Sequence, residues 1–161
     1  MYNWVSQNKI PYAKIGDLLR FKKSDIDKWI AGKTTYPTID VPLVGVVSCG
    51  TPLLAEENIE AKIPVSTKLA KPPHKYFLLR ASGDSMDEAG INNGDLVLVR
   101  QQMVAGSGDN VVALIDDEAT IKELQISNKA IILKPRSTNK EHQPITLTKD
   151  LKIQGVVITT I

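Results

Sequence analysis

Short apolar runs rich in β-branched residues, each ended by turn residues, recur through the last three quarters of the chain and constrain its fold most. Val, Ile and Thr favour extended backbone, whereas Gly, Asn and Asp favour turns. Strands this short and this close together are typical of an all-β domain with a strongly bent sheet. We therefore predict a mainly β, bent barrel-like domain. Its strands are expected at 41–47, 59–65, 76–81, 96–100, 111–115, 119–125, 130–134 and 151–161.

A serine follows one of these runs where the chain is expected to leave the sheet. The run 76–81 ends at Ser82-Gly83-Asp84, and Ser85 and Met86 come next. Serine is a weak nucleophile that needs a base within hydrogen-bond reach. Backbone N–H groups at such a turn can stabilise an oxyanion, and those of Ser85 and Met86 are the candidates. The Met86 side chain itself is expected in the core.

A lysine lies inside another expected strand. Strict alternation places Thr120, Lys122 and Leu124 on one face, so the Lys122 amine faces inward. A buried amine is costly unless it is neutral or paired, and burial lowers its pKa so that it can act as a base. A Ser-Lys pair is a known variant of the serine nucleophile arrangement. Ser85 lies 37 positions away, so sheet packing alone could bring the pair together, and a purely structural role for both residues stays open.

Four segments of the chain together resemble the S24 peptidase family, the LexA/UmuD-type self-cleaving repressors. The resemblance covers roughly residues 41–161, and the order and spacing of the motifs make it specific. The segments are Pro42-Leu43-Val44-Gly45-Val46-Val47-Ser48-Cys49-Gly50-Thr51-Pro52-Leu53-Leu54-Ala55, Phe77-Leu78-Leu79-Arg80-Ala81-Ser82-Gly83-Asp84-Ser85-Met86, Gly90-Ile91-Asn92-Asn93-Gly94-Asp95-Leu96 and Asp116-Asp117-Glu118-Ala119-Thr120-Ile121-Lys122.

The resemblance implies a role for several residues. Ser85 would be the nucleophile, Lys122 the neutral general base and Cys49-Gly50 the bond that is cut. A Cys-Gly bond is closer to UmuD, whereas LexA usually has Ala-Gly. The family also implies a homodimer formed through the C-terminal domain, and a RecA filament on single-stranded DNA as a possible trigger of cleavage. No cofactor is expected.

The first 33 residues predict a small, partial α+β winged-helix segment. The end of a helix is followed by a hairpin around Gly16-Asp17 and by a second helix, capped by Ser24 with Asp27 in a capping box. The pattern is similar to the excisionase-type, MerR-related winged helix-turn-helix module, whose front we expect to be missing. Its surviving wing would contact the phosphates of a double-stranded DNA operator, with binding weak or absent in this form. The expected contacts are Lys14, Arg20, Lys22 and Lys23.

Composition sets the remaining expectations. Residues 1–33 hold seven basic and three acidic residues, a net charge of +4 against +2 for the whole chain, which favours a nucleic-acid-binding end. Cys49 is the only cysteine, so no internal disulfide can form. No run approaches the roughly 20 apolar residues of a membrane span, and we expect a cytoplasmic protein without membrane contact. Two histidines and one cysteine are too few and too scattered for a zinc site, so no metal is expected.

The leading hypothesis is a LexA-like repressor of the SOS response that cuts itself at Cys49-Gly50. We expect a DNA-binding segment at 1–33, a linker at 34–41, and a catalytic and dimerisation domain at 42–161 that contains the cleavage segment. Three alternatives stay open. They are a UmuD-like subunit of a translesion polymerase activated by self-cleavage, a signal-peptidase-like enzyme that acts in trans, and a DNA-binding module that does not cleave.

Overall fold

The computed structural model divides into two compact units, Met1–Pro37 and Thr38–Ile161. It describes residues 10–34, 37–46, 50, 52–147 and 151–161. Within these ranges, no helix has the length and apolar character needed to span a bilayer. The predicted end of a first helix at residues 1–9 lies outside the described residues.

The first unit contains a two-stranded hairpin and a helix. Strands β1 (Ala13–Ile15) and β2 (Leu18–Arg20) pair antiparallel around a turn in which Gly16 adopts a positive φ of 62°. Helix α2 (Lys23–Thr34) follows. The predicted Ser24 cap is wrong, because the Lys22 carbonyl already accepts the first N–H bonds of the helix. Asp27 pairs instead with Lys23, at 2.7 Å.

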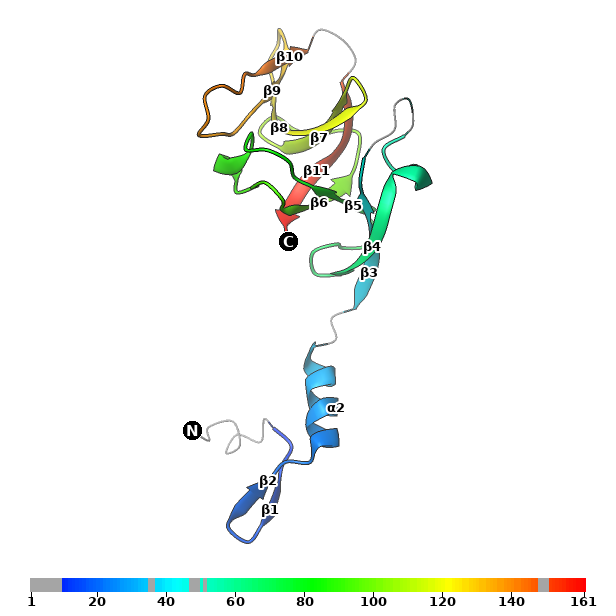
Figure 1. Cartoon of the computed structure of the whole chain (residues 1–161), viewed down its shortest axis with the longest axis vertical. Coiled ribbons are helices and arrows are strands. Elements are labelled where there is room, and N and C mark those ends of the chain that lie inside the picture. Colours follow the sequence, from blue (N-terminus) through cyan, green and yellow to red (C-terminus); the bar gives the residue numbers. More distant parts are fainter. Residues whose placement is uncertain (1–9, 35–36, 47–49, 51, 148–150) are drawn as a thin grey trace. The chain divides into compact units, whose positions relative to one another are not determined.

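The second unit is one nine-stranded sheet with the order β10-β9-β8-β7-β11-β6-β5-β3-β4 (Figure 1). All neighbours pair antiparallel except β3 and β5, which are parallel. Two short 3-10 helices, η1 and η2, lie in the loops. The elements are β3 (Thr38–Val44), η1 (Glu56–Asn58), β4 (Ile59–Ser66), β5 (Tyr76–Arg80), η2 (Asp87–Ala89), β6 (Leu96–Gln101), β7 (Asn110–Ile115), β8 (Glu118–Ile126), β9 (Ile131–Lys134), β10 (Ile145–Leu147) and β11 (Lys152–Thr160).

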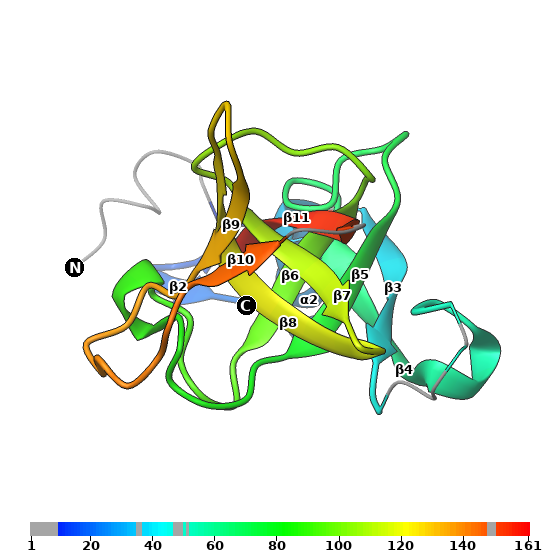
Figure 2. The ribbon, with the colours of Figure 1, turned by 90° about the horizontal axis from the view of Figure 1, so that it is seen from above.

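The sheet bends strongly, so that it curls over itself when seen from above (Figure 2). Strand β11 lies between β6 and β7, and its pairing register shifts once against each of them. Such irregularities let a strand bend and twist more strongly. The prediction of a mainly β, bent sheet domain after a small N-terminal segment is therefore confirmed.

Both faces of the central strands are buried, which explains their almost continuous apolar sequence. Alternation along β5 places Phe77 and Leu79 in one core cluster and Leu78 in another. Val97 and Val99 of β6 join the first cluster. A third cluster covers β7, β8 and β9, where Val111, Ala113, Leu124 and Leu133 are buried.

The linker predicted at 34–41 overlaps a strand. Residues 38–41 belong to β3 and pair with β4, for example Thr38 with Ser66 and Val41 with Ile63. The predicted linker as a whole is polar and contains Pro37, which by itself indicates a linker. The partner strand, which supplies the hydrogen bonds, becomes apparent only in the folded chain.

Candidate active site

Ser85 lies in the turn between β5 and η2, half-buried. Its carbonyl oxygen accepts a hydrogen bond from the Arg136 N–H at 2.9 Å. The next side chain, Met86, is only 3% exposed and packs in the same core cluster as Phe77 and Leu79. The buried methionine thus anchors the turn that carries Ser85 to the core.

Lys122 reaches the Ser85 hydroxyl from β8. Its Nζ lies 2.9 Å from Ser85 Oγ, 3.0 Å from Thr120 Oγ1 and 3.0 Å from the Ile121 carbonyl oxygen. As the alternation of β8 predicts, Thr120 shares the face of Lys122. Among the residues that the structure describes, no carboxylate forms an ion pair with this amine.

The surroundings of Lys122 favour an uncharged amine. The residue is only 9% exposed. Removal from water penalises the ammonium form, and this desolvation lowers the pKa of Lys122 below its ordinary value. A neutral amine has two N–H donors and one lone pair. Its two donors can bind the Thr120 hydroxyl and the Ile121 carbonyl, and its lone pair can accept the Ser85 proton.

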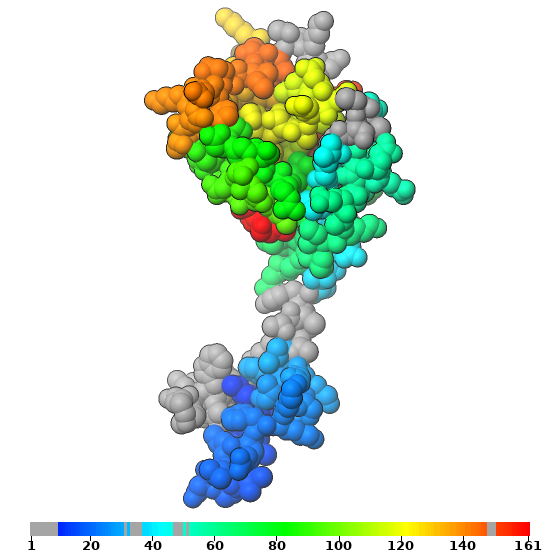
Figure 3. Space-filling view, viewed as in Figure 1, coloured from blue at the N-terminus to red at the C-terminus, as the bar shows by residue number. Residues whose placement is uncertain are grey.

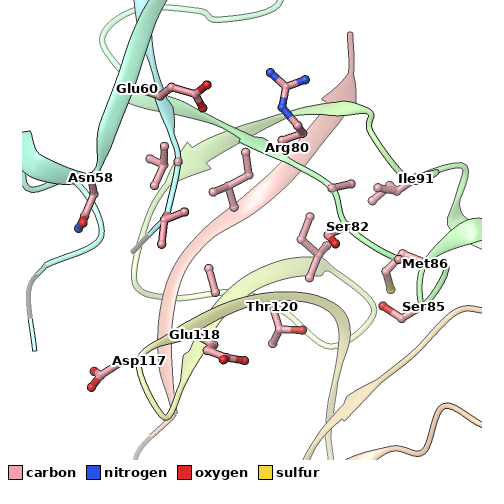
Figure 4. Close-up of a pocket in the computed structure, with 18 of the residues that line it drawn as sticks. Asn58, Glu60, Arg80, Ser82, Ser85, Met86, Ile91, Asp117, Glu118 and Thr120 are labelled. Atoms are coloured by element: carbon pink, nitrogen blue, oxygen red, sulfur yellow. The ribbon is translucent and has the colours of Figure 1, made fainter. Parts of the chain in front are cut away.

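The two side chains lie in a groove of about 930 Å³. In Figure 3 the green residues around position 85, the yellow start of β8 and the cyan end of β3 gather on one face of the second unit. Figure 4 shows Ser85 and Thr120 at one end of this groove and Asn58 and Glu60 at the other. Residues of β8 and of the β3–β4 region both line the groove.

The backbone N–H groups of Ser85 and Met86 are available at the same turn. Neither donates to an oxygen of the residues that the structure describes. Both residues line the groove. They are therefore placed where N–H donors could face a carbonyl oxygen in the groove.

The chain on either side of the predicted scissile bond is held beside the groove. Val44 and Leu53 are each 2% exposed and belong to the core cluster that contains Met86. Cys49 lies outside the described residues. Gly50 is exposed, has a positive φ of 76° that favours glycine, and is not among the described residues that line the groove.

The predicted DNA contacts are all exposed, but the structure does not gather them into one patch. Alternation places Lys14 and Arg20 on opposite faces of the β1–β2 hairpin, because Lys14 pairs with Leu19, the residue before Arg20. Lys22 and Lys23 lie at the start of α2, and Lys23 is paired with Asp27. An exposed pair of this kind contributes little to stability.

Sequence reasoning missed the loop between β9 and β10, which contacts the Ser85 turn. We call residues 135–144 the β9–β10 loop. Its contacts include Arg136 with Glu123 and His142 with Asp84, at 2.6 Å each. Hydrogen bonds from Arg136 and His142 lower the pKa of Glu123 and of Asp84, respectively. The loop has no periodicity, and its composition alone carries no signal of these contacts.

Within the described ranges, no cluster of three or more His, Cys, Asp or Glu side chains could hold a metal ion.

Comparison with known proteins finds two family matches. A model of the Peptidase S24-like family matches residues 42–158, and a model of a helix-turn-helix domain matches residues 1–34. The chain is similar to proteins named LexA repressor. It is 45% identical over 120 residues to that of Clostridium perfringens, covering 74% of this chain and 58% of the relative. It is 49% identical over 120 residues to that of Caldicellulosiruptor saccharolyticus, covering 74% and 57%. The chain thus spans less than two thirds of the length of these curated relatives.

Proposed function

The chain belongs to the Peptidase S24-like family, and from this premise we propose that it is a LexA-like repressor that inactivates itself by cutting Cys49-Gly50. Ser85 is the nucleophile and Lys122 its general base. One observation carries the proposal. Two residues 37 positions apart meet with 2.9 Å between Nζ and Oγ, and the amine is desolvated.

The proposed reaction starts with the neutral Lys122 amine. It takes the proton of Ser85 Oγ, which attacks the carbonyl carbon of Cys49. The N–H groups of Ser85 and Met86 stabilise the resulting oxyanion. The C–N bond then breaks as the Lys122 ammonium returns its proton to the Gly50 nitrogen. Water, activated by the same amine, hydrolyses the ester and regenerates the Ser85 hydroxyl.

The cleavage segment is a substrate held in the same chain. Residues 45–52 are anchored at both ends, by Val44 and Leu53, in the core beneath the Ser85 turn. Residues 44–46 also line the groove. Reaction then needs only the closure of a short loop instead of the encounter of two molecules. We expect cleavage to be first order and independent of protein concentration.

Cleavage in this proposal separates DNA binding from dimerisation. Residues 1–33 are the DNA-binding segment, residues 42–161 the catalytic and dimerisation domain, and the cut leaves fragments 1–49 and 50–161. A dimer binds two half-sites far more tightly than one subunit binds one, so the cut releases the operator. The proposed setting is the bacterial cytoplasm and the SOS response, with a RecA filament as trigger. The names of the relatives support the repressor role, and the helix-turn-helix match supports DNA binding.

The rate of self-cleavage should rise with pH. Only the neutral form of Lys122 can accept the Ser85 proton, so the rate should increase about tenfold per pH unit and level off above the pKa of the folded state. Desolvation places this inflection below the ordinary lysine pKa of about 10.4. Mass spectrometry of the purified protein, sampled over time between pH 6 and 11, measures the two fragments.

The matched control for this experiment is Ser85→Ala, which keeps the groove and the amine. It should give no fragments at any pH. An intact wild-type protein at every pH, or equal cleavage of the alanine variant, would contradict the proposed activity. Cleavage by the wild type only at high protein concentration would indicate a reaction in trans, as in the signal-peptidase-like alternative.

DNA binding should depend on the uncut chain. We expect the Ser85→Ala protein to bind double-stranded DNA of mixed sequence at low salt. The fragment 50–161 should not bind it, because the exposed cations of the first unit are then absent. Fluorescence anisotropy with a labelled duplex measures both, and binding should weaken as salt increases. Equal binding by the fragment would favour a role without a repressor function, such as the polymerase-subunit alternative.

A further inference from the structure

The β9–β10 loop holds the turn that carries Ser85 on both sides of the serine. On one side, Asp84 lies 2.6 Å from His142 Nε2 and accepts a bond from Asn139 Nδ2 at 3.2 Å. On the other side, the Asp87 carboxylate accepts bonds from the N–H and the hydroxyl of Thr138, at 2.9 and 2.6 Å. The serine turn is thus fastened to a segment more than 50 positions away in sequence.

Within the β9–β10 loop, Arg136 is the residue that bonds to Ser85 itself. Its N–H donates to the Ser85 carbonyl oxygen at 2.9 Å, and its carbonyl oxygen accepts the Glu88 N–H at 2.9 Å. The backbone of Arg136 therefore lies alongside the serine turn. These two backbone bonds fix the position of the turn relative to the β9–β10 loop.

The Arg136 side chain reaches the strand that carries the base. Its Nη1 donates to Glu123 Oε2 at 2.6 Å, and Glu123 directly follows Lys122 on β8. The pair is partly shielded from water, with side-chain exposures of 43% for Arg136 and 13% for Glu123. A charge-assisted bond of this length in partial burial is stronger than an exposed ion pair.

We propose that Arg136 is a positioning residue for self-cleavage, because it joins the Ser85 turn to strand β8 and so sets the distance between Ser85 Oγ and Lys122 Nζ. This inference rests on the proposed function. Among the described residues, the Lys122 amine bonds to Ser85, Thr120 and Ile121 and not to Arg136, so Arg136 acts through Ser85 and Glu123. A displacement of about 1 Å between a nucleophile and its base can lower a rate about 100-fold.

Arg136→Ala removes the side-chain bond and leaves the backbone bonds possible. We expect the plateau of the self-cleavage rate at high pH to fall about 10- to 100-fold, and the inflection of the pH profile to stay where the wild type has it. Arg136→Lys can still reach Glu123 with one donor and should recover part of the rate. Lys140→Ala is the matched control, since it removes an exposed cation from the same loop and should cleave at the wild-type rate.

A double-mutant cycle with Glu123→Ala tests the route of the effect. If Arg136 acts through Glu123, the double variant should be about as slow as either single variant, because both substitutions break the same bond. Fully additive losses of rate would place the effect of Arg136 elsewhere and overturn this part of the inference. Arg136→Lys keeps the test decisive should the alanine variant fold poorly.

Two results would overturn the inference, and neither resembles failure of the proposed function. Wild-type cleavage by Arg136→Ala would show that the bond does not position the serine. An unchanged plateau with the inflection moved up toward the ordinary lysine pKa would show that Arg136 only shields Lys122 from water. If the wild type itself gives no fragments, or Ser85→Ala gives them, the self-cleavage proposal fails instead.

Discussion

Replacing Lys122 with methionine is expected to lower the rate of self-cleavage at Cys49-Gly50 by about 10³–10⁴-fold. Methionine has a similar length and fills the space of the lysine side chain without an amine to accept the Ser85 proton. Among the described residues, Ser85 Oγ would then have no base within hydrogen-bond reach. Time courses of fragment formation by mass spectrometry at the alkaline plateau of the wild type measure the loss.

The same substitution should not weaken the fold at neutral pH. The pKa of Lys122 is lowered by desolvation, so the folded state binds the proton less well than the unfolded state does. Stability is therefore reduced at low pH and rises as pH increases from the folded-state pKa to the ordinary value of about 10.4. Removing the amine removes this penalty. We expect the melting temperature of Lys122→Met at pH 7 to equal or exceed that of the wild type.

Lys152→Met serves as the control, because it makes the same exchange at an exposed strand position. It should cleave like the wild type. Cleavage by Lys122→Met within tenfold of the wild-type rate would refute the role of the amine as base. A large fall in its melting temperature would refute the energetic part of the argument, since the lysine would then be structural.

Replacing Gly155 with alanine is expected to destabilise the second unit by about 2–3 kcal/mol. Gly155 lies in β11, where this strand pairs with both β6 and β7. An added Cβ would overlap the Arg100 carbonyl oxygen and would lie 2.6 Å from Val99 Cγ1. A backbone oxygen in a paired strand cannot move aside cheaply. The melting temperature should fall by roughly 5–10 °C, as measured by circular dichroism.

Gly106→Ala is the matched control for this prediction. A Cβ at position 106 would have only the Asp109 carboxylate nearby, at an ordinary contact distance of 3.5 Å. Its effect on the free energy of unfolding should stay within about 0.5 kcal/mol. If Gly155→Ala melted within 2 °C of the wild type, the close approach of β11 to β6 would be wrong.

Much of the second unit could be predicted from local sequence. The strands from β5 to β9 match apolar runs within one or two residues, because propensity and alternation act over only a few positions. The turn after β5 places Ser85, and alternation along β8 points Lys122 inward. Strand β10 was missed, because three residues give too short a pattern.

The sequence by itself determined the strands, the turn that presents Ser85 and the inward direction of Lys122, since these depend on neighbours in the chain. Only the tertiary structure decided that β11 separates β6 from β7 and that residues 38–41 form a strand. The same holds for the approach of Arg136 to Ser85 and Glu123. These features depend on hydrogen bonds and packing between segments far apart in sequence, which no local propensity encodes.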